Sequence, residues 1–110
     1  RINNPFGGFY KIIVDDALVG GISIFCKENT TIFWIGPMFI LPEYQGKGIA
    51  QKTLLLAEEL YPQASRWELA TILQEKKNCY LYEKMGYKST GITKNINDKI
   101  TLGFYKKEKY

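Results

Sequence analysis

The feature that most constrains this chain is a glycine-containing turn, Leu41–Ala50, between two strongly patterned segments. An almost unbroken apolar run, Thr31–Leu41, precedes it, and an amphipathic segment, Lys47–Tyr61, follows it. This order predicts a buried strand, a turn and a helix. Glycines at such a turn leave backbone N–H groups uncovered at the helix N-terminus, where they can surround a phosphate group. Lys47 opposes the helix macrodipole, so either an anion sits beside it or its side chain simply points into solvent.

Hydrophobic periodicity predicts an antiparallel three-stranded meander, a helical crossover, a fourth strand, a short helix and a terminal hairpin. The expected strands are Phe9–Val14, Leu18–Lys27, Thr31–Leu41 and Trp67–Leu73, with a hairpin of Tyr87–Thr93 and Lys99–Lys106 that turns across Asn95–Asp98. The first expected helix is Lys47–Tyr61; its core-facing stripe is Ile49, Thr53, Leu56 and Leu60, with Ala50, Leu54, Ala57 and Tyr61 beside it. The second expected helix is Lys76–Met85, which Gly86 ends in the left-handed conformation. Gly36-Pro37 predicts a bulge in the third strand or a local parting from a neighbouring strand, because proline cannot donate to a sheet ladder.

The fold class that these elements predict is α+β, with a mixed, mainly antiparallel twisted sheet of about six strands and two helices. We expect one domain over residues 1–110, in which residues 1–8 form a leading segment.

Composition narrows the chemistry of this domain. The chain of 110 residues contains no histidine, which removes the usual general base and the commonest metal ligand, and we expect no metal site. Cys26 and Cys79 lie far apart without metal or redox spacing, which fits idle thiols in a reducing cytoplasm. The net charge of +4 comes from scattered lysines, so we expect small anionic ligands and no nucleic acid. The longest apolar run is far shorter than a membrane span of about 20 residues.

Three phosphate-binding motifs contain glycines at comparable spacing. A Walker-type P-loop fails because Leu41 and Gly48 occupy positions that require glycine and Ser or Thr. The dinucleotide motif G-x-G-x-x-G/A fails because Gln51 occupies its third small position. The segment Gln45–Ala50, QGKGIA, matches Q/R-x-x-G-x-G/A, the acyl-CoA signature of the GNAT N-acetyltransferase superfamily, which this chain resembles.

A second segment carries the same resemblance. Asn78–Tyr87 reads NCYLYEKMGY and is similar to the family's N…YEK-x-G-[FY] segment. Asn78 and Tyr82 are four residues apart and therefore share one helix face. The order of the elements also follows the family, and the resemblance covers Phe9–Lys106. It implies the GNAT-like acyl-CoA N-acyltransferase fold.

The resemblance further implies that acetyl-CoA is the co-substrate and that its acetyl group passes to a primary amine, of a small molecule or a protein, by direct attack. Cofactor contacts are implied along the strand at Phe39, Ile40 and Leu41, and for the diphosphate at Gln45, Gly46, Lys47, Gly48, Ile49 and Ala50. Asn78 would bind the cofactor arm or else cap its helix. Tyr82 would be the general acid for the leaving thiolate, or else a buried aromatic like Tyr80 and Tyr87. A backbone N–H near Ile40 would stabilise the oxyanion.

The general base is less well defined. Its candidates are Glu43, Glu68 and Glu75, although each is a residue type that usually lies solvated on the surface. We favour Glu75, which lies just past the end of the fourth predicted strand.

The acceptor side carries the largest departure from the family. Family members usually begin with a strand and a helical pair that wall the acceptor pocket, which residues 1–8 cannot supply. Either that region is missing or a second subunit replaces it, as in a homodimer. Trp34 and Trp67 would line an acceptor pocket or pack in the core. The alternative functions are a non-catalytic acyl-CoA-binding or sensing module and an interaction domain with a vestigial turn.

Overall fold

The computed structural model describes residues 6–109, so residues 1–5 of the expected leading segment lie outside the described residues. The strands are β1 (Gly7–Val14), β2 (Ala17–Cys26), β3 (Ile32–Ile40), β4 (Arg66–Ile72), β5 (Lys88–Asn97) and β6 (Ile100–Glu108). The helices are α1 (Ile49–Leu60) and α2 (Lys76–Lys84), with a short 3-10 turn, η1 (Pro42–Tyr44). None of the described helices is long and apolar enough to cross a lipid bilayer.

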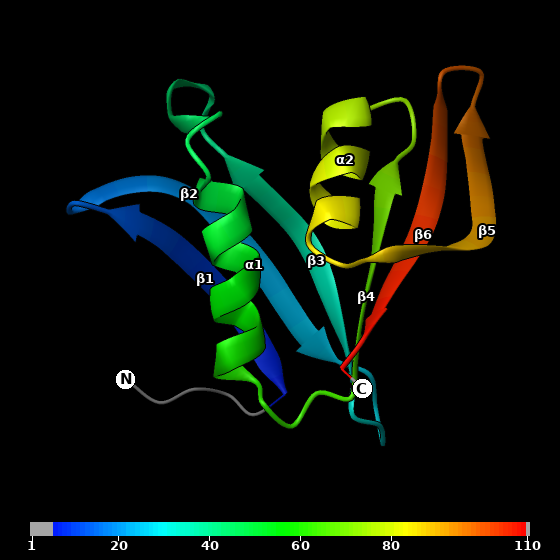
Figure 1. The fold of residues 1–110 in the computed structure, drawn as a ribbon, viewed down its shortest axis with the longest axis horizontal. Coiled ribbons are helices and arrows are strands. Elements are labelled where there is room, and N and C mark those ends of the chain that lie inside the picture. Colours follow the sequence, from blue (N-terminus) through cyan, green and yellow to red (C-terminus); the bar gives the residue numbers. More distant parts are fainter. Residues whose placement is uncertain (1–5, 110) are drawn as a thin grey trace.

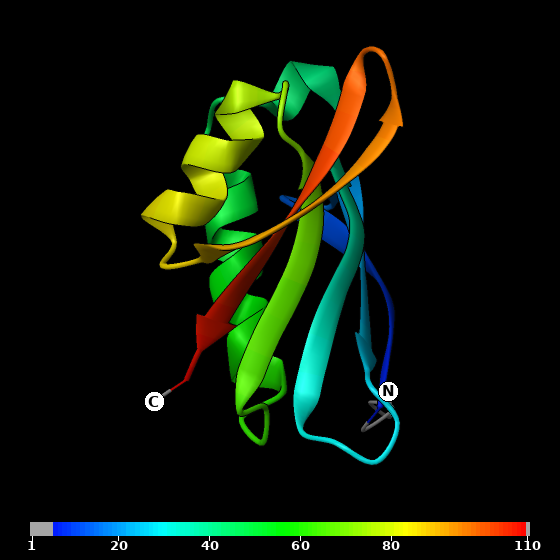
Figure 2. The same ribbon diagram turned by 90° about the vertical axis from the view of Figure 1, so that its right-hand side faces the viewer.

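The strands form one six-stranded sheet in the order β1-β2-β3-β4-β6-β5 (Figure 1). All neighbours are antiparallel except β3 and β4, which are parallel and are joined through α1. The meander, the helical crossover and the α+β fold class are therefore confirmed. Both helices cover the same face of the sheet (Figure 2), and the core lies between them and that face.

The terminal hairpin differs from its prediction. The predicted loop began at Asn95, whereas β5 continues to Asn97 and the turn consists of residues 98–99. The side-chain oxygen Oδ1 of Asn97 accepts the backbone N–H groups of Lys99 at 2.8 Å and Ile100 at 3.0 Å. This side chain supplies the hydrogen bonds that close the turn, so the strand extends through residues that read as loop formers.

The stripe predicted for α1 is only partly correct. Thr53, Leu54 and Ala57 are buried, as predicted, but Leu56 is 57% exposed and Leu60 is 41% exposed. The sheet contacts one side of α1, so the leucines on its flank stay in solvent although they share the helical period.

Tyr87 is a core residue whose side-chain hydroxyl makes no hydrogen bond with the described residues. The residue is 2% exposed, and its ring packs edge-on against Tyr82 with centroids 5.9 Å apart. Its hydroxyl is buried without a hydrogen-bond partner among the described residues. Burial, with a smaller effect of the Glu58 charge, raises the pKa of Tyr87, so the hydroxyl stays neutral.

We expect Tyr87→Phe to raise the free energy of unfolding by about 1 kcal/mol, because it removes a buried polar atom that makes no bond. Urea denaturation with an unchanged m-value measures this. Tyr105→Phe is the matched control: the Tyr105 hydroxyl donates to Glu83 Oε2 at 3.0 Å, so this variant should lose stability. A loss of stability in Tyr87→Phe would instead mean that a buried water satisfies the hydroxyl.

Candidate functional site

The sheet splits between its two parallel strands. Only three residue pairs join β3 to β4, namely Ile32–Arg66, Phe33–Trp67 and Trp34–Glu68. Beyond them the strands diverge, and Figure 1 shows them together at one end and apart at the other. The split begins where Gly36-Pro37 interrupts β3. There the β2–β3 register shifts, because Ile24 pairs with Ile35 whereas Ile22 pairs with Met38. The bulge predicted at Gly36-Pro37 is confirmed.

Past this bulge, the β2–β3 register determines which backbone groups face the split. The Leu41 N–H donates to Val19 O at 2.8 Å, next to the Gly20–Ile40 pair. Ile40 is therefore at a non-hydrogen-bonded position, and its own N–H and C=O point away from β2. By the same alternation Met38 also points its backbone groups into the split, whereas those of Phe39 point toward β2.

The glycine turn follows directly. Gly46 and Gly48 have φ angles of 77° and 80°, a region that favours glycine, and Gly48 is the N-cap of α1. A Cβ placed on either glycine would meet no atom within 4 Å. Within residues 6–109, no protein group accepts a hydrogen bond from the backbone N–H groups of residues 46–51. The Gln45 N–H, by contrast, donates to Pro42 O at 3.2 Å and is not available to a ligand.

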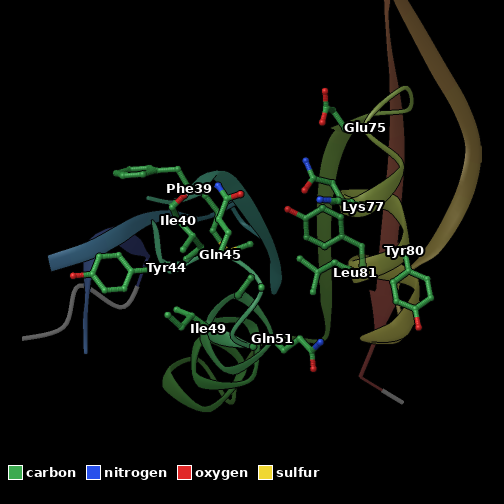
Figure 3. Close-up of a pocket in the computed structure, with 16 residues that line it drawn as sticks. Phe39, Ile40, Tyr44, Gln45, Ile49, Gln51, Glu75, Lys77, Tyr80 and Leu81 are labelled. Atoms are coloured by element: carbon green, nitrogen blue, oxygen red, sulfur yellow. Dashed lines mark hydrogen bonds between the residues drawn. The ribbon is translucent and has the colours of Figure 1, made fainter. Parts of the chain in front are cut away.

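A cavity of about 520 Å³ lies between the end of β3, the glycine turn and α2, within the usual size range for small-molecule sites (Figure 3). It brings together most of the predicted site residues: Phe39, Ile40, Gln45, Gly46, Gly48, Ile49, Ala50, Glu75, Asn78 and Tyr82. Leu41 and Lys47 do not line it. Lys47 is exposed, in line with the solvent alternative for its side chain.

Six further residues, which were not predicted as site residues, also line the cavity: Met38, Tyr44, Gln51, Lys77, Tyr80 and Leu81. Tyr80, expected among the buried aromatics, is instead 68% exposed on α2, so that expectation is wrong. Leu81 was detectable, because it lies three residues after Asn78 and therefore on the helix face that Asn78 shares with Tyr82. Met38 was not, because its position depends on the shifted register of two strands. Lys77 adds a cation to the α2 side of the cavity.

Tyr82 combines a buried ring with a hydroxyl that stays accessible. The residue is 9% exposed and lines the cavity from α2. Its hydroxyl forms no hydrogen bond with the described residues, yet it is not among the fully buried unpaired atoms. Burial, with a smaller effect of the neighbouring Cys79, raises the pKa of Tyr82. The phenol is therefore protonated at neutral pH and can donate a proton into the cavity.

The other residues predicted on α2 lie nearer its N-terminus. Asn78 is exposed and is not the helix cap, since Glu75 occupies that position and no side-chain cap is formed. Glu75 lies at one end of the cavity (Figure 3) and is the only carboxylate among the described lining residues. Tyr82 is seven positions after Glu75, which places the two residues about 10 Å apart along the helix axis.

The two other candidate bases lie outside the cavity. Glu43 is exposed in η1. Glu68 forms ion pairs with Lys27 and with Arg66, the latter at 3.3 Å. Burial raises the pKa of the Glu68 carboxyl, but hydrogen bonds from these two cations outweigh it and hold the pKa below its ordinary value. Such a carboxylate is a weak base.

The two tryptophans lie in different environments, and neither is in the cavity. Trp67 is 3% exposed and packs in the core against Phe33, with ring centroids 5.3 Å apart. Trp34 lies between Phe25 and Phe104, with centroid distances of 6.3 and 6.2 Å, and beneath the Lys27 ammonium. Neither lines the cavity beside the glycine turn.

Comparison with solved structures agrees with this architecture. A candidate streptothricin acetyltransferase from Bacillus anthracis, in complex with acetyl coenzyme A, matches with a TM-score of 0.83 at 18% identity, over 97% of this chain and 65% of that chain. A Bacillus subtilis acetyltransferase in complex with CoA matches with a TM-score of 0.80 at 18% identity, over 94% and 78%. A GNAT-family acetyltransferase from Streptococcus pneumoniae matches with a TM-score of 0.81 at 17% identity, over 96% of this chain and 68% of that chain. The chain thus spans 65% to 78% of the lengths of these proteins. No curated protein sequence gives a significant match.

The split six-stranded sheet with two helices is the acyl-CoA N-acyltransferase fold. Residues 5–89 match the family model of the acetyltransferase (GNAT) domain, which is more than half of the chain. The protein belongs to the GNAT acetyltransferase family.

Proposed function

We propose that this protein is an N-acetyltransferase that moves the acetyl group of acetyl-CoA to a primary amine by direct attack. The observation that carries the proposal is one cavity with unbonded turn amides on one side and the accessible Tyr82 hydroxyl on the other. The complexes of two structural neighbours with acetyl-CoA and CoA support the choice of co-substrate.

The co-substrate would use backbone groups from two adjoining segments. Its diphosphate would accept hydrogen bonds from the N–H groups of residues 46–50 at the positive end of α1. Its pantetheine arm would pair with the exposed edge of β3 through Met38 and Ile40, the residues whose N–H and C=O groups face the split. Phe39 would contribute its side chain, and Asn78 would approach the arm from α2.

The reaction then requires a proton to leave the amine and another to reach the thiolate. The neutral amine attacks the thioester carbon, and the negative charge that develops on oxygen is stabilised by a backbone N–H of Met38 or Ile40. Collapse of this intermediate breaks the C–S bond, and Tyr82 gives its proton to the sulfur. Glu75 would take the amine proton, directly or through water. The products are the N-acetylated amine and CoA.

The test is release of CoA thiol from acetyl-CoA in the presence of a panel of primary amines, with thermal unfolding measured alongside. Amine-dependent thiol release supports the proposal. Stabilisation by acetyl-CoA without transfer to any amine supports the acyl-CoA-binding module instead, and an unchanged unfolding temperature rejects both.

Two further properties belong to the proposal. Cys26 and Cys79 are unpaired thiols, which fits a reducing compartment, and we assign the protein to the cytoplasm. We also propose a homodimer, in which a second subunit contributes to the acceptor side. Sedimentation velocity with and without acetyl-CoA tests this.

A further inference from the structure

Gln45 is tied to the preceding strand through its side chain as well as its backbone. Its Nε2 donates to the Ile40 carbonyl oxygen at 2.8 Å, across five residues. Its backbone N–H donates to Pro42 O at 3.2 Å, and the Tyr44 N–H donates to Leu41 O at 2.9 Å. The side-chain bond therefore closes a loop around the short η1 turn and returns the chain to the end of β3.

The partner of this bond is itself held in the sheet. Ile40 pairs with Gly20 of β2, and the next residue, Leu41, donates to Val19 O at 2.8 Å. Gln45 therefore fastens the start of the glycine turn to a fixed point. The part of the turn after Gln45 has few other restraints within residues 6–109, because the N–H groups of residues 46–51 are unbonded and Gly46 and Gly48 have open space around them.

We propose that the Gln45 side chain is a positioning group that holds the glycine turn in register with the exposed edge of β3. This inference rests on the proposed function, in which the diphosphate binds the turn and the pantetheine arm binds the strand. The bond keeps the two half-sites at one separation before the ligand arrives, which lowers the ordering cost of binding. A carbonyl oxygen has two lone pairs, so Ile40 keeps one acceptor position, as well as its N–H, for the ligand.

The first experiment uses the ligand-free protein and needs no activity. Gln45→Met removes the donor but keeps the side-chain length, whereas Gln45→Arg retains N–H donors at similar reach. Backbone ¹⁵N relaxation should show lower order parameters at Gly46 and Gly48 in Gln45→Met and near wild-type values in Gln45→Arg. Unchanged order in Gln45→Met would overturn the proposal, whatever the protein's activity.

The second experiment separates the turn from the strand. Calorimetry gives the dissociation constants of CoA and of pantetheine, which lacks the diphosphate. Gln45→Met should raise the dissociation constant of CoA by about tenfold and change that of pantetheine by no more than about twofold. Gln45→Arg should restore the affinity for CoA. Equal weakening of both ligands would overturn the positioning role, because Gln45 would then support β3 alone.

Gln74→Met is the matched control, since the Gln74 side-chain oxygen Oε1 accepts a hydrogen bond from the Thr101 backbone N–H at 3.1 Å, but Gln74 lies outside the cavity. Both affinities should be unchanged in it, and a comparable loss of CoA affinity would overturn the proposal. The two hypotheses fail separately. Selective loss of CoA affinity in Gln45→Met without acetyl transfer by the wild type supports the positioning role and rejects the enzyme. Acetyl transfer by the wild type, together with an equal loss of affinity for CoA and pantetheine in Gln45→Met, supports the enzyme and rejects the positioning role.

Discussion

Tyr82→Phe is expected to lower the rate constant for acetyl transfer by about 10²–10⁴-fold, the usual contribution of a general acid. The Tyr82 ring is buried against the core and its hydroxyl is accessible from the α2 side of the cavity, where the leaving thiolate needs a proton. Acetyl-CoA affinity should change little, because the ring that fills the space is kept. Single-turnover thiol release at saturating acetyl-CoA and amine measures the effect.

Tyr87→Phe is the control for this change, because its ring contacts that of Tyr82 but its hydroxyl is enclosed in the core. It should transfer acetyl groups at the wild-type rate. If Tyr82→Phe also keeps the wild-type rate, another group or water protonates the thiolate and Tyr82 leaves the mechanism.

The pH profile should carry the signature of the same group. A general acid works in its protonated form, and burial, with Cys79, holds the pKa of Tyr82 above its ordinary value of 10.0. The wild-type rate should therefore rise as the acceptor amine loses its proton, and should fall only above pH 10. In Tyr82→Phe that alkaline fall should be absent. A wild-type decline that begins near neutral pH would indicate a different acid.

Features that depend on nearby residues were predictable from the sequence. Two glycines two residues apart, between an apolar strand and an amphipathic helix, indicate positive φ angles and uncovered amides wherever the strand lies. The four-residue spacing of Asn78 and Tyr82 likewise places both on one helix face. The turn and α2 were therefore predicted as parts of one site, and they line the same cavity.

Features that depend on pairing between distant segments were not predictable. The strand edge implied for the cofactor was Phe39 to Leu41, but the shifted β2–β3 register turns the backbone of Met38 and Ile40 into the split. The Leu41 N–H instead donates a hydrogen bond to Val19 O in β2. The sequence shows that Gly36-Pro37 disturbs the strand, but the phase of the strand beyond it depends on which β2 residue is opposite. Likewise, only the packed core separates Tyr82 from Tyr87, which are chemically identical in the sequence.

Gly48→Leu is expected to abolish stabilisation by acetyl-CoA, which at 100 times the dissociation constant should be about 2.7 kcal/mol in the wild type. The added side chain would occupy the open space beside the N-terminus of α1, where the diphosphate is proposed to bind. It would also disfavour the positive φ angle that exposes the amides. Thermal unfolding of wild type and variant, with and without saturating acetyl-CoA, measures the loss.

Strain alone would lower the stability of Gly48→Leu, so the control must share that strain. Gly91 in β5 has a φ angle of 84° and open space around it, but it does not line the cavity. Gly91→Leu should therefore lose about 1–2 kcal/mol of intrinsic stability, the cost of a left-handed residue, and keep the full acetyl-CoA shift. The two variants therefore differ in the stabilisation that acetyl-CoA adds, and not in the stability of the ligand-free protein. If Gly48→Leu keeps the wild-type shift, the diphosphate binds elsewhere, and neither the turn amides nor the positive end of α1 contributes to acyl-CoA recognition.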